Sequence, residues 1–112
     1  MHEYPITRRI IEIAGEYAEK YHAKEVKAIN LVVGDTCGYV ASSIELYFDL
    51  IAEGTPCEKA RLHIERIEPK LQCSACKTLF VRKPFTFECP SCKGEGRPTD
   101  IGQEFYVKSI EI

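Results

Sequence analysis

Residues 73–92 read CSACKTLFVRKPFTFECPSC, and this stretch decides how the rest of the chain is interpreted. It holds two Cys-x-x-Cys pairs, Cys73 with Cys76 and Cys89 with Cys92, separated by twelve residues. Four thiolates at this spacing fill a tetrahedral shell and leave no position for water, so we expect a structural zinc site. Paired spacing without a secretory signal favours a metal in a reducing compartment over disulfides. Rubredoxin-type iron, which uses similar ligands, is the alternative metal.

Apolar periodicity predicts regular elements on both sides of these cysteines. A helix is predicted over about residues 6–22 and a strand over 26–33. A second helix is predicted to start at Ser42-Ser43-Ile44-Glu45, which has the spacing of a capping box. Alternating apolar residues predict a strand at 60–65, and residues 105–112 are β-prone. Because a lone strand is unstable, the last one is expected to join the two earlier strands in one sheet.

The predicted fold class is therefore α+β. Two helices pack on a small three-stranded sheet, and a zinc-ribbon-like module is inserted before the last strand. We expect residues 1–68 plus 99–112 to form the α+β domain and residues 69–98 to form a zinc-binding domain. At 112 residues the chain fits one small domain with such a metal-stapled insertion.

Charge is distributed unevenly along the chain. Residues 69–98 hold six basic residues against two acidic ones, a net +4, and the rest holds nine against fifteen, a net −6. A basic lobe on an acidic body could dock an acidic partner or nucleic acid, or its lysines could offset a dianionic tetrathiolate. The chain has no apolar run long enough to span a bilayer, so a cytoplasmic location is expected.

The N-terminus, Met1-His2-Glu3, is a candidate for a second and different metal site. The Met1 amine, the His2 backbone nitrogen and the His2 imidazole can wrap one ion in fused chelate rings. A flat nitrogen set of this kind suits nickel(II) or copper(II). Glu3 offers an oxygen ligand or a partner for the imidazole. The alternatives are a plain surface histidine, and a solvated glutamate favoured near a helix N-terminus.

The remaining histidines and cysteines have ordinary interpretations. His22, at the predicted end of the first helix, is favoured there by its charge alone, and His63 is expected on the surface of its strand. Cys37 and Cys57 are expected to be small, buried or half-buried thiols. No phosphate loop, zinc-protease motif or nucleophile motif occurs, so the sequence predicts that the protein is not an enzyme.

Taken together, these features resemble the HypA/HybF family of nickel metallochaperones, which act in [NiFe]-hydrogenase maturation. The resemblance rests on Met1-His2-Glu3, the run Ile44-Glu45-Leu46-Tyr47-Phe48-Asp49, Gly54-Thr55, Ala60-Arg61-Leu62-His63-Ile64-Glu65, the two cysteine pairs and the closing Ile110-Glu111. It implies a nickel-binding α+β domain with an inserted zinc domain. It implies transported nickel on His2, with help from the Met1 backbone and Glu3, and structural zinc on the four cysteines. Delivery to the hydrogenase large subunit, with the GTPase HypB, is also implied.

The chain departs from the family pattern at two places. Some members carry histidines beside the zinc cysteines, whereas Lys77 and Lys93 follow the pairs here. Val40 lies where some members have an acidic residue near nickel, and Asp35 is a carboxylate that could substitute for it. Whether urease is also served is left open.

Two rival functions come from other classes. One is a zinc-ribbon adaptor or nucleic-acid-binding protein that stacks bases on Phe80, Phe85 and Phe87. The other is a redox protein that uses the thiols of Cys73 and Cys76.

Overall fold

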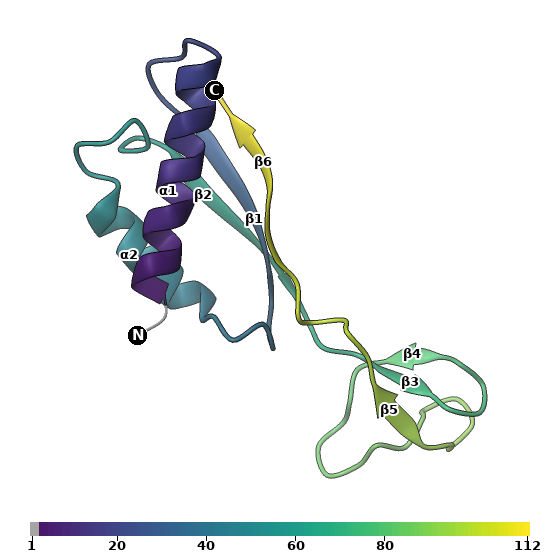
Figure 1. Ribbon diagram of the computed structural model, residues 1–112. Coiled ribbons are helices and arrows are strands. Elements are labelled where there is room, and N and C mark those ends of the chain that lie inside the picture. The colour runs from purple at the N-terminus through teal and green to yellow at the C-terminus, as the bar shows by residue number, and fades with distance from the viewer. Residues whose placement is uncertain (1–2) are drawn as a thin grey trace.

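The computed structural model describes residues 3–112, which form an elongated molecule with principal extents of 55 × 28 × 16 Å. Figure 1 shows two lobes. We call residues 3–68 and 99–112 the body, and residues 69–98 the cysteine lobe. The elements in chain order are α1 (Glu3–Lys20), β1 (Ala28–Gly34), α2 (Ala41–Ile51), β2 (Arg61–Ile67), β3 (Leu71–Cys73), β4 (Leu79–Phe80), β5 (Gly96–Pro98) and β6 (Phe105–Glu111).

The body is a three-stranded sheet with both helices on one face (Figure 1). β1 lies in the centre, parallel to β2 and antiparallel to β6. The parallel pair is connected through α2, because parallel strands need a long crossover. Ile29, Leu31 and Val33 of β1 are buried in one core with apolar side chains of both helices. The predicted α+β class and the pairing of the last strand with the two earlier ones are confirmed.

Helix α1 starts at Glu3, three residues before the predicted start, and it ends at Lys20 rather than at 22. Its buried side chains recur at helical spacing and face the core: Thr7, Ile10, Ile11, Ala14 and Ala18. The first turn is held on α2 by an edge-to-face contact between Tyr4 and Tyr47, whose ring centroids are 5.5 Å apart.

The end of α1 is set by backbone geometry around His22. The Ala23 N–H donates to the Ala18 carbonyl at 2.8 Å, and the His22 N–H donates to the Glu19 carbonyl at 3.1 Å. This pair of bonds is a Schellman motif, which needs a left-handed residue at the position of His22, and its φ is 57°. His22 is exposed, as predicted, and His63 is exposed on β2.

The predicted capping box at the start of α2 is wrong. The helix begins at Ala41, its N-cap is Val40, and no side chain from its own first turn caps it. Instead, the Val40 N–H donates to the Glu3 carboxylate of α1 at 3.2 Å. A tertiary contact thus supplies an acceptor that a local box would have supplied, and sequence spacing alone cannot register such a contact.

The cysteine lobe has its own small sheet, ordered β4-β3-β5, and a core of only four buried residues: Leu71, Cys73, Phe80 and Cys89. Two of these four are cysteines. A core this small cannot offset the conformational entropy of ordering about thirty residues without a further constraint, such as a metal.

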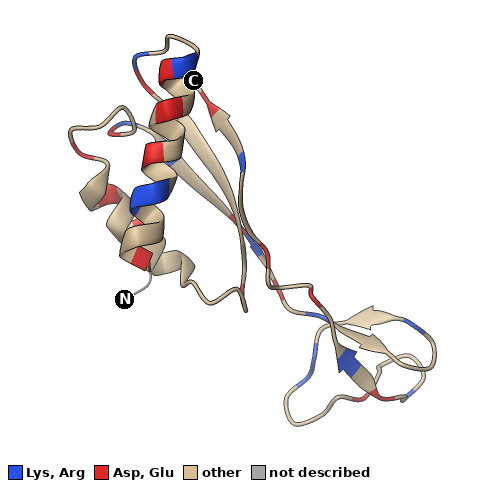
Figure 2. Ribbon diagram, in the orientation of Figure 1, with Lys and Arg blue, Asp and Glu red and all other residues tan. Residues whose placement is uncertain are grey.

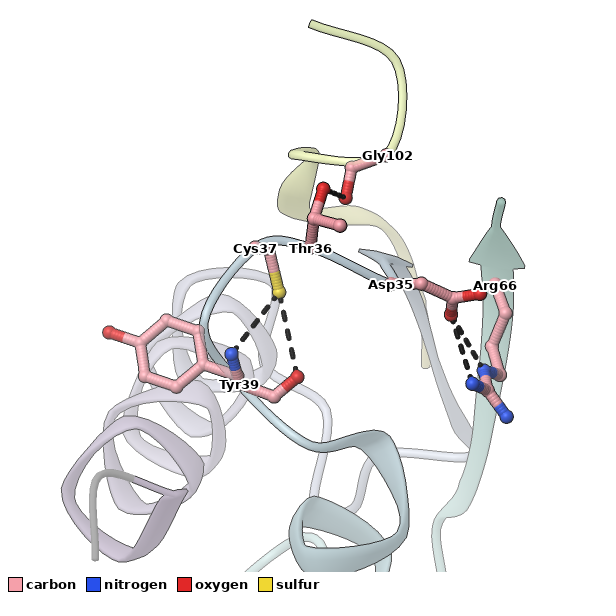
Figure 3. Close-up of polar contacts among 6 residues, drawn as sticks. All are labelled: Asp35, Thr36, Cys37, Tyr39, Arg66 and Gly102. Atoms are coloured by element: carbon pink, nitrogen blue, oxygen red, sulfur yellow. Dashed lines mark hydrogen bonds and ion pairs between the residues drawn. The ribbon is translucent and has the colours of Figure 1, made fainter. Parts of the chain in front are cut away.

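The two lobes meet at a joint of close backbone contacts. A Cβ on Gly34, the last residue of β1, would lie 2.0 Å from the Gly102 carbonyl oxygen. Gly102 itself has φ of 105°, and a Cβ there would lie 2.7 Å from Pro69 Cα. The Thr36 N–H and hydroxyl both donate to the Gly102 carbonyl, at 2.8 and 2.9 Å (Figure 3). The loop after β1 is thus tied to the segment that returns from the cysteine lobe.

Candidate metal centres

The four cysteines predicted as ligands come together in the cysteine lobe, with all Sγ atoms within 4.8 Å of one another. Cys73 Sγ lies 3.4 Å from Cys92 Sγ, and Cys76 Sγ lies 3.7 Å from Cys89 Sγ. A tetrahedral ion with sulfur at about 2.3 Å requires sulfur atoms about 3.8 Å apart. The donor set therefore fits such an ion, and the predicted clustering is confirmed. The identity of the ion stays a prediction.

Each cysteine pair is shaped by a tight turn with a left-handed residue after its second cysteine. Lys77 has φ of 66° and Lys93 has φ of 64°. Their N–H groups donate to the carbonyls of Cys73 and Cys89, at 3.1 and 2.9 Å. The Cys76 N–H lies 3.4 Å from Cys73 Sγ, so the turn also directs a backbone donor at a ligand sulfur.

Gly94 completes the second turn, and no sequence pattern identified it as a residue of the site. A Cβ at this position would lie 2.9 Å from Cys73 Sγ and 3.2 Å from Cys92 Sγ. Only glycine leaves room for the sulfur cluster here. Its signal in the sequence was its place two residues after the second cysteine pair, in Cys92-Lys93-Gly94.

Without a cation the pKa values of the Cys76 and Cys92 thiols are shifted in opposite directions. The Thr78 hydroxyl and N–H lower the pKa of the Cys76 thiol to about 6, because both favour the thiolate. The Gly94 N–H also lowers the pKa of Cys92, but the neighbouring Cys73 and Cys76 sulfurs outweigh it and raise this pKa to about 12. Thiolates in contact repel one another, so full ionisation requires a bound cation.

The N-terminal candidate site is described only at Glu3, since Met1 and His2 lie outside the described residues. Glu3 is buried, with 7% of its surface exposed, and one carboxylate oxygen accepts the Val40 N–H. Its carbonyl accepts the Thr7 hydroxyl at 2.5 Å. Glu3 therefore holds the first turn of α1 against the start of α2. Its predicted role as a nickel ligand is not tested by these contacts.

The loop from Asp35 to Val40 lies beside this end of α1 (Figure 3). Asp35, the carboxylate considered as a substitute ligand, accepts from Arg66 Nε and Nη2 at 3.1 and 2.9 Å. Cys37 is half-buried, and its Sγ contacts the Tyr39 backbone nitrogen at 3.4 Å. Asp35 is thus held in an ion pair with Arg66. Asp35 and Val40 both line a hollow of about 240 Å³.

Other titratable candidates are apart from both centres. His22 lies at the opposite end of α1 from Glu3, roughly 28 Å away at the helical rise per residue. Cys57 is fully buried in the body core, where burial raises the pKa of its thiol. Within residues 3–112, the four cysteines of the cysteine lobe are the only group of three or more ligand side chains close enough to hold an ion.

Fold and site together define a class of protein: an α+β body with an inserted lobe in which four cysteines cluster closely enough to hold a metal ion. The chain matches, over residues 1–112, the family described as hydrogenase/urease nickel incorporation, metallochaperone, HypA. It belongs to the HypA family, whose members are maturation factors and not enzymes.

Individual relatives agree with this assignment over nearly their whole length. A hydrogenase maturation factor HypA from Caldanaerobacter subterraneus is 37% identical, with 100% of this chain and 99% of the relative covered. One from Dehalococcoides mccartyi is 32% identical, with 100% and 94% covered. The solution structure of the nickel metallochaperone HypA from Helicobacter pylori has the same fold, with a TM-score of 0.65 at 24% identity, covering 100% of this chain and 97% of that one. Among the described residues, no helix is both long and apolar enough to cross a membrane.

Proposed function

We propose that this chain carries nickel(II) on Met1, His2 and Glu3 and delivers it to the large subunit of [NiFe]-hydrogenase during maturation. The observation that supports it best is the match to a nickel-incorporation family along the full chain. A carrier must bind its cargo and also release it. A terminal chelate with few protein ligands suits that need, whereas a closed four-thiolate site does not.

In this proposal the two lobes have separate roles. Residues 1–68 plus 99–112 form the nickel-binding domain, and residues 69–98 form a zinc-binding domain in which Cys73, Cys76, Cys89 and Cys92 hold structural zinc. Glu3 supports the assignment because its buried carboxylate is bonded to the start of α2, which fixes the helix end that follows His2. The GTPase HypB is the proposed partner in delivery, and the cytoplasm is the proposed location.

The experiment is a calorimetric nickel titration of zinc-loaded protein in three forms. These are the native chain, a chain with one extra residue ahead of Met1, and a matched control with one extra residue after Ile112. One nickel ion per chain is expected for the native and control forms, and the N-terminal extension should abolish binding because it removes the free amine. Binding that survives the extension would refute the N-terminal site. Absence of binding in all three forms would refute the carrier function.

Acid should release the cargo, since protons and nickel compete for the Met1 amine and the His2 imidazole. Delivery itself is tested by mixing the nickel-loaded chain with immature hydrogenase large subunit, with and without HypB. Transfer that equals the rate from free nickel would contradict delivery by this protein.

A further inference from the structure

A hollow of about 240 Å³ lies where the chain passes between the body and the cysteine lobe, and we call it the linker hollow (Figure 1). Both parts of the chain line it: Ile101 and Gln103 come from the body, and Leu71 and Arg82 come from the cysteine lobe. None of the four clustered cysteines lines it, nor does Glu3. It is therefore a separate site from both candidate metal centres.

Hydrogen bonds between the connecting segments fix the frame of the linker hollow. The Thr99 hydroxyl donates to the Lys70 carbonyl at 2.7 Å, and the Ile101 N–H donates to the Thr99 hydroxyl at 3.2 Å. Thr36, which also lines the hollow, donates its hydroxyl to the Gly102 carbonyl at 2.9 Å (Figure 3). The shape of the hollow is thus set before a ligand binds, which lowers the entropic cost of binding.

Much of the wall of the linker hollow is apolar. Pro69, Leu71, Pro98 and Ile101 contribute to it. Leu71 belongs to the small core of the cysteine lobe, whereas Ile101 is half-buried and both prolines are exposed. A mostly apolar wall with a few polar groups is typical of a ligand site, and drug-sized ligands occupy about 300–1,000 Å³. A hollow below that range suits a small ligand with an apolar body.

The charged side chains of the linker hollow are both cations. Lys70 and Arg82 line it, and no Asp or Glu of residues 3–112 does. The Arg82 guanidinium is held 4.3 Å from the centroid of the Phe87 ring, and its Nε donates to the Thr86 carbonyl at 3.3 Å. Lys70 Nζ and both Nη atoms of Arg82 have no ion-pair partner in the described chain. Figure 2 shows the wider setting, a lobe in which basic residues outnumber acidic ones.

Neighbouring carboxylates do not neutralise this pair of cations. Glu68, Asp100 and Glu104 flank the connecting segments in the sequence, but none of them lines the hollow. Glu104 instead accepts the Gly102 N–H at 2.7 Å. The hollow therefore combines an apolar wall with a positive charge that is not balanced within it.

We propose that the linker hollow binds a small carboxylic acid, whose carboxylate faces Lys70 and Arg82 and whose apolar body packs on the prolines and Ile101. A guanidinium presents a planar fork that matches the two oxygens of a carboxylate. Inorganic phosphate would match the cations, but it has no apolar part to cover the wall. A bound acid would contact the body and the cysteine lobe at once. This inference is independent of the nickel-carrier proposal.

The test is an amide NMR titration of the zinc-loaded full chain with sodium phenylacetate, which joins a carboxylate to a small apolar ring. Saturable shifts at the amides of Lys70, Thr99 and Gln103 are expected, with a dissociation constant of about 1 mM or lower. Acetate keeps the charge without the ring, and 2-phenylethanol keeps the ring without the charge. Each should bind about tenfold more weakly or worse, as should phosphate, because each loses one of the two kinds of contact.

Two variants and a matched control locate the binding. Lys70→Gln and Arg82→Gln should each weaken phenylacetate binding about fivefold or more, because each removes one cation from the hollow. Lys83→Gln removes the neighbouring charge, which does not line the hollow, and should change little. Zinc content and circular dichroism of each variant establish that it is folded.

Saturable binding that both variants weaken and the control retains would support the proposal. Absence of saturable shifts, or shifts centred elsewhere, would overturn it. Equal binding of acetate or phosphate would overturn the role of the apolar wall, and equal binding of 2-phenylethanol would overturn that of the cations. A peptide ending in Asp-Phe that binds more tightly than phenylacetate would overturn the small-ligand assignment in favour of a partner protein.

Discussion

Gly34→Ala tests most directly the close approach between the end of β1 and the segment that returns from the cysteine lobe. The added Cβ would lie 2.0 Å from the Gly102 oxygen, 2.2 Å from its carbonyl carbon and 2.8 Å from the Gln103 nitrogen. Ordinary contact begins near 3.4 Å, so the Gly102 carbonyl has to retreat by about 1.4 Å. All three atoms belong to the backbone, so no side-chain rotation can relieve the overlap.

The cost can be worked out from the bonds that this retreat breaks. The Gly102 carbonyl accepts two hydrogen bonds from Thr36, one from its N–H and one from its hydroxyl. Losing the two bonds from Thr36 costs about 1 kcal/mol each. Overpacking adds about 1–3 kcal/mol. We therefore expect Gly34→Ala to lower the free energy of unfolding of the body by about 3–5 kcal/mol.

The assay is urea unfolding followed by helical circular dichroism, which reports on the body because both helices lie there. Gly15→Ala is the matched control. It lies in α1 with nothing within 4 Å of its added Cβ, so it should stabilise the body by about 0.5–1 kcal/mol. Equal stabilities of Gly34→Ala and the wild type would refute the close approach of the two segments.

Three further predictions concern the cap, the cysteine lobe and the buried thiol. Glu3→Ala should lower the free energy of unfolding by about 1–2 kcal/mol. Glu3→Gln should lower it less, because its amide oxygen can still accept the Val40 N–H. Equal decreases for the two variants in urea unfolding would argue against the cap. A strong chelator should unfold the cysteine lobe and leave the body folded, so amide NMR spectra should lose dispersion only for that lobe, and collapse of all signals would contradict the separation. Burial raises the pKa of the Cys57 thiol above 9.0, so on raising the pH the unfolded chain loses this proton before the folded chain does. The free energy of unfolding should therefore fall as the pH rises above about 9. Unfolding free energies at about pH 8 and pH 10 should show a smaller decrease in Cys57→Ala, and identical decreases would contradict the assignment.

Local pattern was a good guide wherever a signal repeats along the chain. The spacing of apolar residues predicted α1 and the three strands of the body, β1, β2 and β6, to within a few residues, because packing on a core imposes those periods. The two Cys-x-x-Cys pairs predicted the sulfur cluster, because each pair is a local turn and only one long-range approach was needed.

Prediction failed where a distant partner replaced a local one. The start of α2 was misassigned because Ser42 and Glu45 have capping-box spacing, yet the acceptor for the Val40 N–H is Glu3, thirty-seven residues away. Gly94 was overlooked because its role depends on Cys73 Sγ, which reaches it only when both turns close on one centre.

The amino-acid sequence by itself therefore determined the α+β class, the insertion of the cysteine lobe, its cluster of four cysteines and the family resemblance. These depend on residue types at short, regular spacing. Only the tertiary structure decided that Glu3 caps α2, that Gly34 approaches Gly102 closely, and that Gly102 in turn lies against Pro69. The physical reason is that each of these features is a contact or a relation between segments far apart in the chain, and the folded backbone alone sets those distances.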